Sequence, residues 1–465
     1  MAGIGFRLQK LLSGDSYTDL VKAYLYSAMI AAGPMLVVMA TLGIVKRIAQ
    51  DSLGLDGEAE FMGLVVYVYS FSMVIVSPFY FTVTRFLADR YYLKDFASFS
   101  PTYFSVMGIV IVLQVMLGGW WVSRLPIPLE VAVWEVMLYV SVSGIWMASI
   151  FLSAAHNYIW MAVSFVGGGI LGVICGIVGG YYYGLAGFLG GFAIGQIATW
   201  AMLSLQIVRE FGYHIAYQFG FLKYFIKYPL LVSVGLLYYI GIWVDKWVFW
   251  MSPNATLILQ HIRVMPDYDT SLFVAYLTIV PSLAFFLIQM ETSFVQVYQS
   301  YFVAIRQHAT FGVISACEQR IADTISNQFQ RFAVFQGLIS GMAILFAPQI
   351  ADLFKLSPAQ VGIFRVGILG AFMQMGMIMI INLLFYFDAQ LDAVLITLLF
   401  MICNAVFAQV TLYLGLPAYG FGYTCASFLS LLIGFFVLDR RIRFMSYWTF
   451  MRQPVVIPKF KLESE

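Results

Sequence analysis

The sequence predicts an all-α polytopic membrane protein with about 12 transmembrane helices in two six-helix bundles, and three observations support this. The chain of 465 residues is 62% hydrophobic and only 10% charged, whereas soluble domains carry roughly 25% charged residues. Its mean hydropathy is +0.88. Its apolar residues form long uncharged runs that lack the period-two alternation of a membrane β-barrel. These observations exclude a soluble enzyme, a disordered protein and a disulfide-rich secreted module.

The uncharged runs have the length of membrane spans, because a helix needs about 20 apolar residues to cross the roughly 30 Å core of a bilayer. The first run, 23–45, is too long for the core of a signal peptide, and we expect it to be a permanent span. Further single spans are expected at 61–84, 96–123, 228–250, 270–290, 332–351 and 366–387.

Two longer runs hold several helices each. Run 136–208 has room for three, with breaks at 156–157 and 181–184, where polar residues and glycine are typical of turns. Run 393–438 divides at 415–417 into two. The glycines that crowd the two spans after the first break predict close helix packing. All runs together give twelve helices.

The distribution of basic residues predicts the orientation. Eighteen of the 25 Lys and Arg lie on the side of the two termini, six lie on the opposite side, and Arg365 lies at the edge of a span. Because cytoplasmic loops are enriched in Lys and Arg, we expect both termini in the cytoplasm and the chain in the cytoplasmic (inner) membrane.

We expect two domains, an N-terminal six-helix bundle over 1–215 and a C-terminal one over 216–465. The second includes a helical stretch at 291–331 and a basic C-terminal tail. Aromatic and aliphatic residues recur at helical spacing in that stretch, which indicates an amphipathic cytoplasmic helix that lies on the membrane or extends the preceding span. The alternative is a plain connector.

Charged residues near the spans are candidates for a transport pathway, since a charge at membrane depth costs roughly 2.5–3.5 kcal/mol on insertion scales. Asp245 and Lys246 either anchor a helix end through a local ion pair or line a polar pathway. Glu291 and Asp388 close two spans at the predicted cytoplasmic end, where ordinary loop polarity is the alternative. Arg365 either lines a cavity or extends its side chain to the outer surface.

Proline and glycine mark candidate helix kinks. Gly33 and Pro34 can bend the first span or unwind it beside a cavity. Pro78 and Pro281 interrupt the second predicted span of each half of the chain, and Pro-interrupted helices in corresponding positions indicate a transporter repeat.

Several kinds of chemistry lack their sequence motifs. The chain has neither a GxxxxGK[ST] phosphate loop nor an HExxH metal motif, and its four histidines are scattered. The four cysteines show no paired spacing. We therefore expect no catalytic residues, no metal and no cofactor. A net charge of +2 gives no field for nucleic acid.

An ordered set of short motifs runs along essentially the full length of the chain. The motifs are Met1-Ala2-Gly3-Ile4-Gly5-Phe6, Lys10-Leu11-Leu12, Ser27 with Ala32-Gly33-Pro34, Asp245-Lys246-Trp247-Val248-Phe249-Trp250, Tyr268-Asp269, Ala275-Tyr276-Leu277, Glu291-Thr292-Ser293-Phe294, Tyr298 and Tyr386-Phe387-Asp388. This set resembles the PelG family of exopolysaccharide transporters, and Arg7 stands where that family usually has an acidic residue.

The resemblance implies membership in the multidrug/oligosaccharidyl-lipid/polysaccharide exporter superfamily, with two bundles around a central cavity. It also implies that the protein acts together with PelD-, PelE- and PelF-like synthase subunits. The PelF-like subunit is a cytoplasmic glycosyltransferase that builds an N-acetylhexosamine polymer from UDP-sugars. The expected function is passage of that nascent polysaccharide across the lipid bilayer. Three alternatives stay open: a cation-coupled small-molecule exporter, a flippase for lipid-linked oligosaccharide, and a non-transporting scaffold for a glycosyltransferase.

Overall fold

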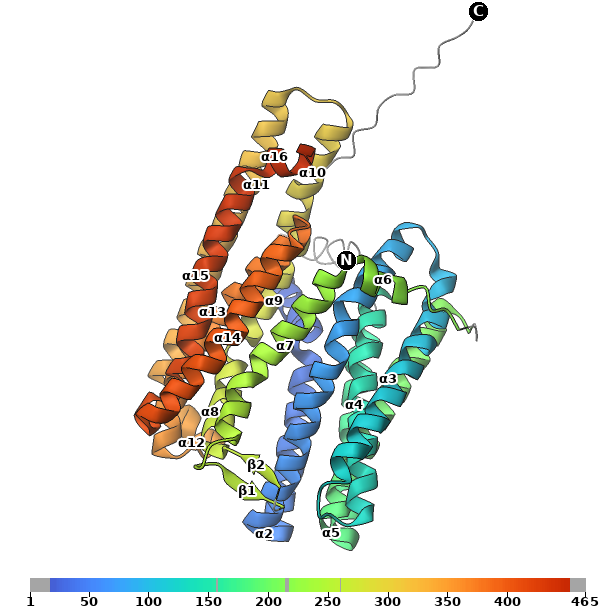
Figure 1. Cartoon of the computed structure of the whole chain (residues 1–465), viewed down its shortest axis with the longest axis vertical. Coiled ribbons are helices and arrows are strands. Elements are labelled where there is room, and N and C mark those ends of the chain that lie inside the picture. The colour runs from blue at the N-terminus through green and yellow to red at the C-terminus, as the bar shows by residue number, and fades with distance from the viewer. Residues whose placement is uncertain (1–16, 156–157, 214–216, 260, 452–465) are drawn as a thin grey trace, which may run out of the picture.

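The computed structural model describes residues 17–155, 158–213, 217–259 and 261–451, and helices dominate it (Figure 1). Two of these helices, α2 (Tyr17–Tyr92) and α5 (Tyr158–Phe211), are 76 and 54 residues long. Each is broken once, at Gly54 (φ 78°, ψ −174°) and at Gly184 (φ 57°, ψ −132°). Only glycine adopts such backbone angles without strain. Each helix is therefore a pair of spans joined by a glycine turn.

The other elements follow the chain in a simple order. Those of the N-terminal half are η1 (Phe96–Ser98), α3 (Phe99–Val122) and α4 (Leu129–Ala155). Those after α5 are α6 (Leu222–Lys227), α7 (Pro229–Trp250), the antiparallel strands β1 (Thr256–Ile258) and β2 (Ile262–Val264), α8 (Pro266–Leu277), α9 (Val280–Gln289), the π-helical turn η2 (Met290–Phe294), α10 (Val295–Arg306), α11 (Phe311–Leu345), α12 (Ala347–Phe354), α13 (Pro358–Tyr386), α14 (Gln390–Leu414), η3 (Leu416–Ala418), α15 (Phe421–Arg443) and α16 (Met445–Met451).

The described residues contain nine helices that are long and apolar enough to cross a membrane, or ten if α11 and α12, bent by 70°, form one span. The apolar parts of α2 and α5 run over Gly33–Tyr92 and Ile159–Phe211, and each is long enough to cross twice at 1.5 Å per residue. Counting both as two spans, and α11 with α12 as one, gives the predicted twelve. Breaks are found at Gly184 and between α14 and α15, as expected.

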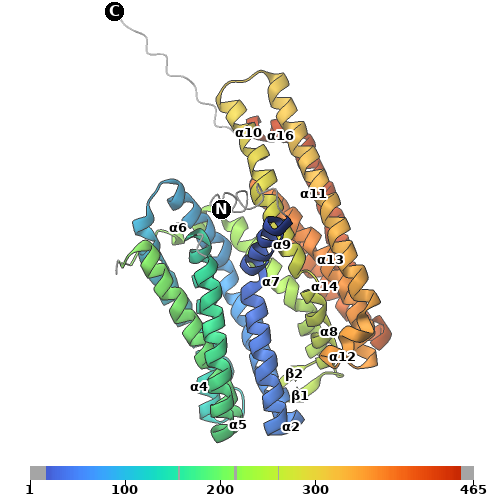
Figure 2. The same cartoon turned by 180° about the vertical axis from the view of Figure 1, so that it is seen from behind.

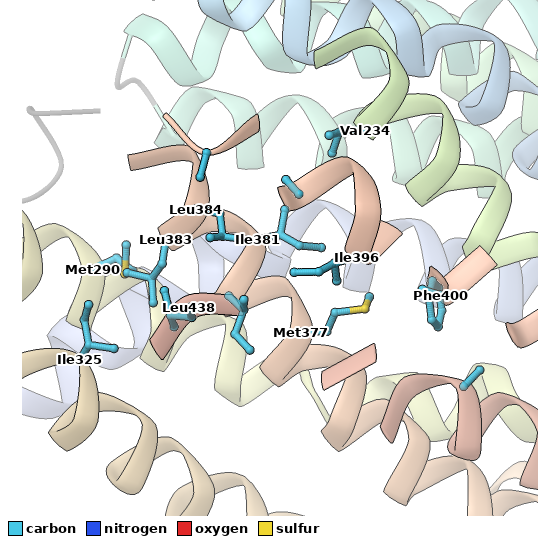
Figure 3. Close-up of a cluster of buried hydrophobic side chains, with 14 of the residues drawn as sticks. Val234, Met290, Ile325, Met377, Ile381, Leu383, Leu384, Ile396, Phe400 and Leu438 are labelled. Carbon is cyan, nitrogen blue, oxygen red and sulfur yellow. The ribbon is translucent and has the colours of Figure 1, made fainter. Parts of the chain in front are cut away.

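The helices form two groups that lie side by side, seen from opposite sides in Figures 1 and 2. The first lobe contains α2, α3, α4 and α5, which pack on one another, and the second contains α7 to α15. The core of the second lobe joins residues of α7, α11, α13, α14 and α15, among them Val234, Ile325, Met377, Phe400 and Leu438 (Figure 3). The predicted boundary at 215/216 falls on residues 214–216, which are outside the described part, and stays a prediction.

Glycines bring the two halves of α5 into backbone contact. A Cβ atom on Gly187 would lie 1.9 Å from the Gly179 carbonyl oxygen, and one on Gly191 would lie 2.2 Å from the Gly176 nitrogen. Real Cβ atoms essentially never come closer than 3.0 Å to such neighbours. Only glycine permits this approach, which confirms the expectation of close packing from the glycine-rich sequence.

The stretch after α9 is a helical projection. The π-turn η2 continues α9 into α10, and α11 returns antiparallel beside it. With 35 residues, α11 is about 52 Å long, more than the roughly 30 Å core of a bilayer. Figure 1 shows α10 and the start of α11 extending past the ends of the neighbouring helices, beside α16. The Tyr301 hydroxyl lies 3.3 Å from a Glu318 carboxylate oxygen and 3.4 Å from Thr449 Oγ1, which ties the three helices together.

Candidate functional site

Asp245 and Lys246 lie inside the second lobe, in the last turns of α7. Asp245 is fully buried and the Lys246 side chain is 8% exposed. The ammonium lies 3.3 Å from the Asp245 carboxylate and donates a hydrogen bond of 3.1 Å to the carbonyl oxygen of Ile242. The two opposite charges therefore compensate each other within the helix that carries them.

The first turns of α8 bring further polar groups to this pair. The Tyr268 hydroxyl donates to Asp245 Oδ2 at 2.7 Å, and its ring stacks on Phe249 with centroids 3.9 Å apart. Asp269 Oδ2 accepts from the Trp250 indole at 2.8 Å and from the Met265 backbone N–H at 3.2 Å. Two carboxyl groups and one ammonium thus share a buried site.

Aromatic rings and an amide extend this site across the second lobe. Lys246 Nζ lies 5.7 Å and 5.4 Å from the ring centroids of Trp243 and Tyr276, within cation–π range. Tyr276 meets Tyr423 of α15 edge to face, and the Tyr423 hydroxyl donates to Gln374 Oε1 of α13 at 2.5 Å. We call this group the polar cluster; its members are Asp245, Lys246, Tyr268, Asp269, Tyr276, Gln374 and Tyr423.

A layer of stacked rings joins the two lobes next to the polar cluster. Tyr67 of α2 lies between Trp250 of α7 and Trp121 of α3, with centroid distances of 4.6 Å and 5.6 Å. Phe71 stacks on Trp247 at 5.3 Å. We call Tyr67, Phe71, Trp121, Trp247 and Trp250 the aromatic seam. Because the Trp250 indole also binds Asp269, one side chain connects the seam to the polar cluster.

Hydrogen bonds fix the positions of the seam's aromatic side chains. The Trp247 indole donates to Ser70 Oγ at 2.9 Å, and the Tyr67 hydroxyl donates to the Arg263 carbonyl oxygen at 2.9 Å. Arg263 belongs to β2, and the hairpin of β1 and β2 packs its buried isoleucines and Val264 against α2. The loop between α7 and α8 therefore fastens the second lobe onto the first.

The contact between α2 and α7 continues toward the other end of both helices. A Cβ atom on Gly235 would lie 2.6 Å from the Ser77 carbonyl oxygen, so the two backbones touch there. Beyond this point Tyr80 meets Tyr239 with centroids 6.2 Å apart. Aromatic side chains thus occur along the interface of the lobes as well as in the seam.

Glu291 and Asp388 belong to segments that the fold brings together. Phe294, at the end of the π-turn that contains Glu291, packs edge to face on Tyr386 and Phe387 at 5.2 Å and 6.4 Å. Asp388 follows directly and is exposed. The Glu291 side chain lies outside the described part of the structure. Single π-turns occur frequently at functional sites.

The remaining sequence candidates are spread over the fold. Arg365 is exposed on α13, and within the described residues it makes no hydrogen bond or ion pair. Gly33, Pro34 and Pro78 lie inside α2, whose non-helical residue is Gly54. Pro281 lies in the first turn of α9, just after the interruption that separates α9 from α8. The role of these residues in transport stays a prediction.

Sequence reasoning missed two buried carboxyl groups. Asp269 enters the sequence argument only as part of a motif, and Glu135 of α4 does not enter it, although its side chain is buried at 1% exposure. A signal was available for Glu135, because the apolar Val131, Leu138 and Val142 at i−4, i+3 and i+7 share its helix face and are buried.

Outside the spans, a tight polar contact follows α2. Asp95 accepts from Ser98 Oγ at 2.6 Å and from Arg90 Nη1 at 3.0 Å. The Ser98 hydrogen bond and the Arg90 charge lower the pKa of the Asp95 carboxyl below its ordinary value. Over the residues that the structure describes, no group of three or more His, Cys, Asp or Glu side chains is arranged to hold a metal ion.

Solved structures of transporters share this fold. An inward-facing multidrug resistance MATE family transporter of the MOP superfamily has a TM-score of 0.60 at 13% identity, covering 90% of this chain and 99% of the other. A MATE transporter in the bent conformation has a TM-score of 0.62 at 14% identity, covering 94% and 98%. A MOP superfamily transporter from Pyrococcus furiosus, described as having a binding pocket of reversed polarity, has a TM-score of 0.59 at 14% identity, covering 96% and 99%.

These likenesses are structural and establish the fold, which is that of two-lobed transporters with twelve helices. No curated protein matches the sequence. A family model described as "PelG: Putative exopolysaccharide Exporter (EPS-E)" matches residues 1–450. Family and fold together indicate a multi-pass membrane transporter rather than an enzyme. The chain belongs to the PelG family of exopolysaccharide exporters.

Proposed function

We propose that the protein conducts a nascent exopolysaccharide, a polymer of N-acetylhexosamine type, across the cytoplasmic membrane. The polymer enters at the end that carries α6 and α16, which is cytoplasmic in this proposal, and leaves at the end of the β-hairpin. The match to an exopolysaccharide exporter family over residues 1–450 carries the proposal. The aromatic interface of the lobes supports it, because the apolar faces of sugar rings stack on aromatic side chains.

The chemistry of a long neutral polymer explains why stacked rings suit this task. A conduit must bind its cargo strongly enough to admit it and weakly enough to release it. Many weak stacking contacts satisfy both conditions, whereas one tight site would hold the chain in place. In the polar cluster behind the seam, Asp269 Oδ1 has no hydrogen-bond partner among the described residues, and it would accept a hydrogen bond from a sugar hydroxyl or amide group.

In this proposal the aromatic seam is the gate of the pathway. Passage requires Tyr67 to leave Trp250, Phe71 to leave Trp247, and the hydrogen bond between Trp247 and Ser70 to break. Each of these contacts joins one lobe to the other, so relative motion of the lobes opens all of them together. The polar cluster holds Trp250 through Asp269 and thereby sets the position to which the seam returns.

Partners enter the proposal at the helical projection. A cytoplasmic glycosyltransferase of the PelF kind, with PelD- and PelE-like subunits, would deliver the growing polymer from UDP-sugars. The projection of α10 and α11 extends furthest at the proposed cytoplasmic end (Figure 1). It exposes apolar side chains there, with Phe311 75% and Val313 49% exposed. We propose that the glycosyltransferase complex contacts this projection.

The direct test deletes this chain in its native host, keeps the synthase, and measures hexosamine polymer outside and inside the cells. The intact chain restores secretion in the deletion strain, whereas the variants Trp247→Ala, Asp245→Ala and Glu291→Ala reduce it at matched protein level in the membrane. Tyr413→Ala removes an exposed aromatic side chain of α14 and serves as the matched control, with normal secretion. Unchanged secretion after deletion, or normal secretion by all three variants, contradicts the proposal.

A further inference from the structure

A cavity of about 300 Å³ lies in the first lobe beside the aromatic seam. Residues of α2, α3 and α4 line it, and five of the twelve lining residues are aromatic: Tyr67, Phe71, Trp120, Trp121 and Tyr139. The volume is at the lower end of the range for sites that bind small molecules. This cavity is separate from the polar cluster, which lies in the second lobe.

Glu135 is the charged group of this wall. Its side chain is buried, and neither carboxylate oxygen has a hydrogen-bond partner among the residues that the structure describes. Arg124 does not compensate it, since the exposed Arg124 guanidinium lies over the Trp120 ring at 5.6 Å. A buried carboxylate without a partner is costly, and a cation bound in this cavity would compensate it.

The chemistry of the wall selects among possible ligands. Divalent metal ions prefer several oxygen ligands, and this wall offers one carboxylate. A sugar would leave most of its hydroxyl groups without polar partners against aromatic and aliphatic side chains. An anion would meet the Glu135 charge. An organic cation satisfies the wall, because aromatic faces attract quaternary ammonium groups and the carboxylate supplies the counter-charge.

We propose that this cavity binds a small organic monocation whose charge lies against Glu135 and among the surrounding aromatic rings. The site does not depend on which polymer the protein exports. Its wall shares Tyr67, Phe71 and Trp121 with the aromatic seam. A cation bound in the first lobe therefore contacts side chains that join this lobe to the second.

The test measures binding of benzyltrimethylammonium to the purified full-length chain in lipid nanodiscs by isothermal titration calorimetry, with empty nanodiscs subtracted. Neopentylbenzene, the uncharged analogue of the same shape, is the competitor. We expect saturable binding to one site, at least tenfold weaker binding to Glu135→Gln, and no competition by neopentylbenzene. Glu130→Gln, which removes an exposed carboxylate from the first turn of the same helix, keeps the affinity of the unchanged chain.

A second variant keeps the test decisive if Glu135→Gln unfolds. Trp121→Leu removes one aromatic wall but keeps the carboxylate, and we expect at least threefold weaker binding of the cation. Three results overturn the proposal: no saturable binding to the unchanged chain, equal affinity of the unchanged chain and the folded cavity variants, or equally good competition by neopentylbenzene.

Discussion

The polar cluster of the second lobe and Glu135 of the first lobe both bury carboxyl groups in helices that are long and apolar enough to cross a membrane, yet these groups are compensated differently. In the cluster, Lys246 and Tyr268 compensate Asp245, and Trp250 donates to Asp269. Glu135 has an aromatic wall and no partner in the described part of the chain. In the cluster only Asp269 Oδ1 is a carboxylate oxygen without a hydrogen-bond partner among the described residues. We infer that the protein itself holds most of the carboxylate oxygens of the first site, whereas Glu135 is compensated only by a ligand.

The largest effect is expected from removing the cation of the compensated site. Lys246→Met leaves Asp245 without its ammonium partner and should lower the free energy of unfolding by about 3–5 kcal/mol, as for other broken buried ion pairs. Thermal unfolding of the purified protein in detergent measures this loss. Arg365→Met is the control, because Arg365 is exposed and its loss should change stability by no more than about 0.5 kcal/mol. Equal unfolding temperatures of the two variants would remove the contrast between the lobes.

At Glu135, the uncompensated carboxyl group, we expect a substitution to increase stability instead of lowering it. Glu135→Leu replaces a buried carboxyl that has no partner by an apolar side chain, and should raise the free energy of unfolding by about 1–3 kcal/mol. The same thermal measurement applies, without any organic cation in the buffer. A loss of stability larger than about 1 kcal/mol would show that Glu135 has a structural partner after all.

A loss of stability smaller than that of Lys246→Met is expected at Trp250, the side chain that connects the cluster to the seam. Trp250→Phe keeps an aromatic ring against Tyr67 but removes the N–H that Asp269 accepts, which should cost about 1.5–3 kcal/mol. Trp247→Phe removes a hydrogen bond to the neutral Ser70 and should cost about 1 kcal/mol. If both variants lose the same stability, the charge of Asp269 contributes nothing to the contact.

The smallest effect concerns acid stability outside the spans. Ser98 and Arg90 hold the pKa of Asp95 below its ordinary value, so the folded state binds the Asp95 proton less readily than the unfolded state. The resulting stabilisation is present above the ordinary pKa of an aspartate, about 3.9, and is lost as pH falls through the lower pKa of the folded state. Unfolding measured between about pH 5 and pH 2.5 should therefore depend less on pH in Asp95→Asn than in the unchanged chain. Identical pH profiles would contradict this role of Asp95.

The sequence predicted the fold well because membrane spans are governed by one strong constraint, the length of uncharged apolar runs. The runs predicted twelve helices, and the breaks at Gly184 and between α14 and α15 followed from turn residues. The first two spans form the single element α2, because the chain turns at Gly54, which has a positive φ, and passes directly from one helix into the next. Nothing in the apolar pattern marks that geometry.

The candidate site was less predictable, because it depends on which helices become neighbours. Asp245 and Lys246 stood out as charges among aromatic residues, but their contacts outside α7 come from α8, and α13 and α15 supply the next residues of the cluster. Asp269 resembles an ordinary acidic residue in the first turn of a helix. It is a site residue because the α7–α8 loop folds back onto α2 and places Trp250 beside it. The helical spacing of apolar residues around Glu135 could be recognised in the sequence, whereas the lack of a hydrogen-bond partner for Glu135 could not.

If polymer passes between the lobes, the aromatic seam must open for each passage. The measurement that tests this places cysteines at Ser70 and Trp247 in a chain without its four native cysteines, and joins them in living cells with a flexible bis-thiosulfonate reagent. Secreted hexosamine polymer should fall from the level of the untreated double-cysteine chain to none when the two lobes are joined, and return to that level after a reducing agent cleaves the link, while the reagent leaves the secretion of either single cysteine variant unchanged. Undiminished secretion by a chain in which the cross-link is complete would contradict passage between the lobes.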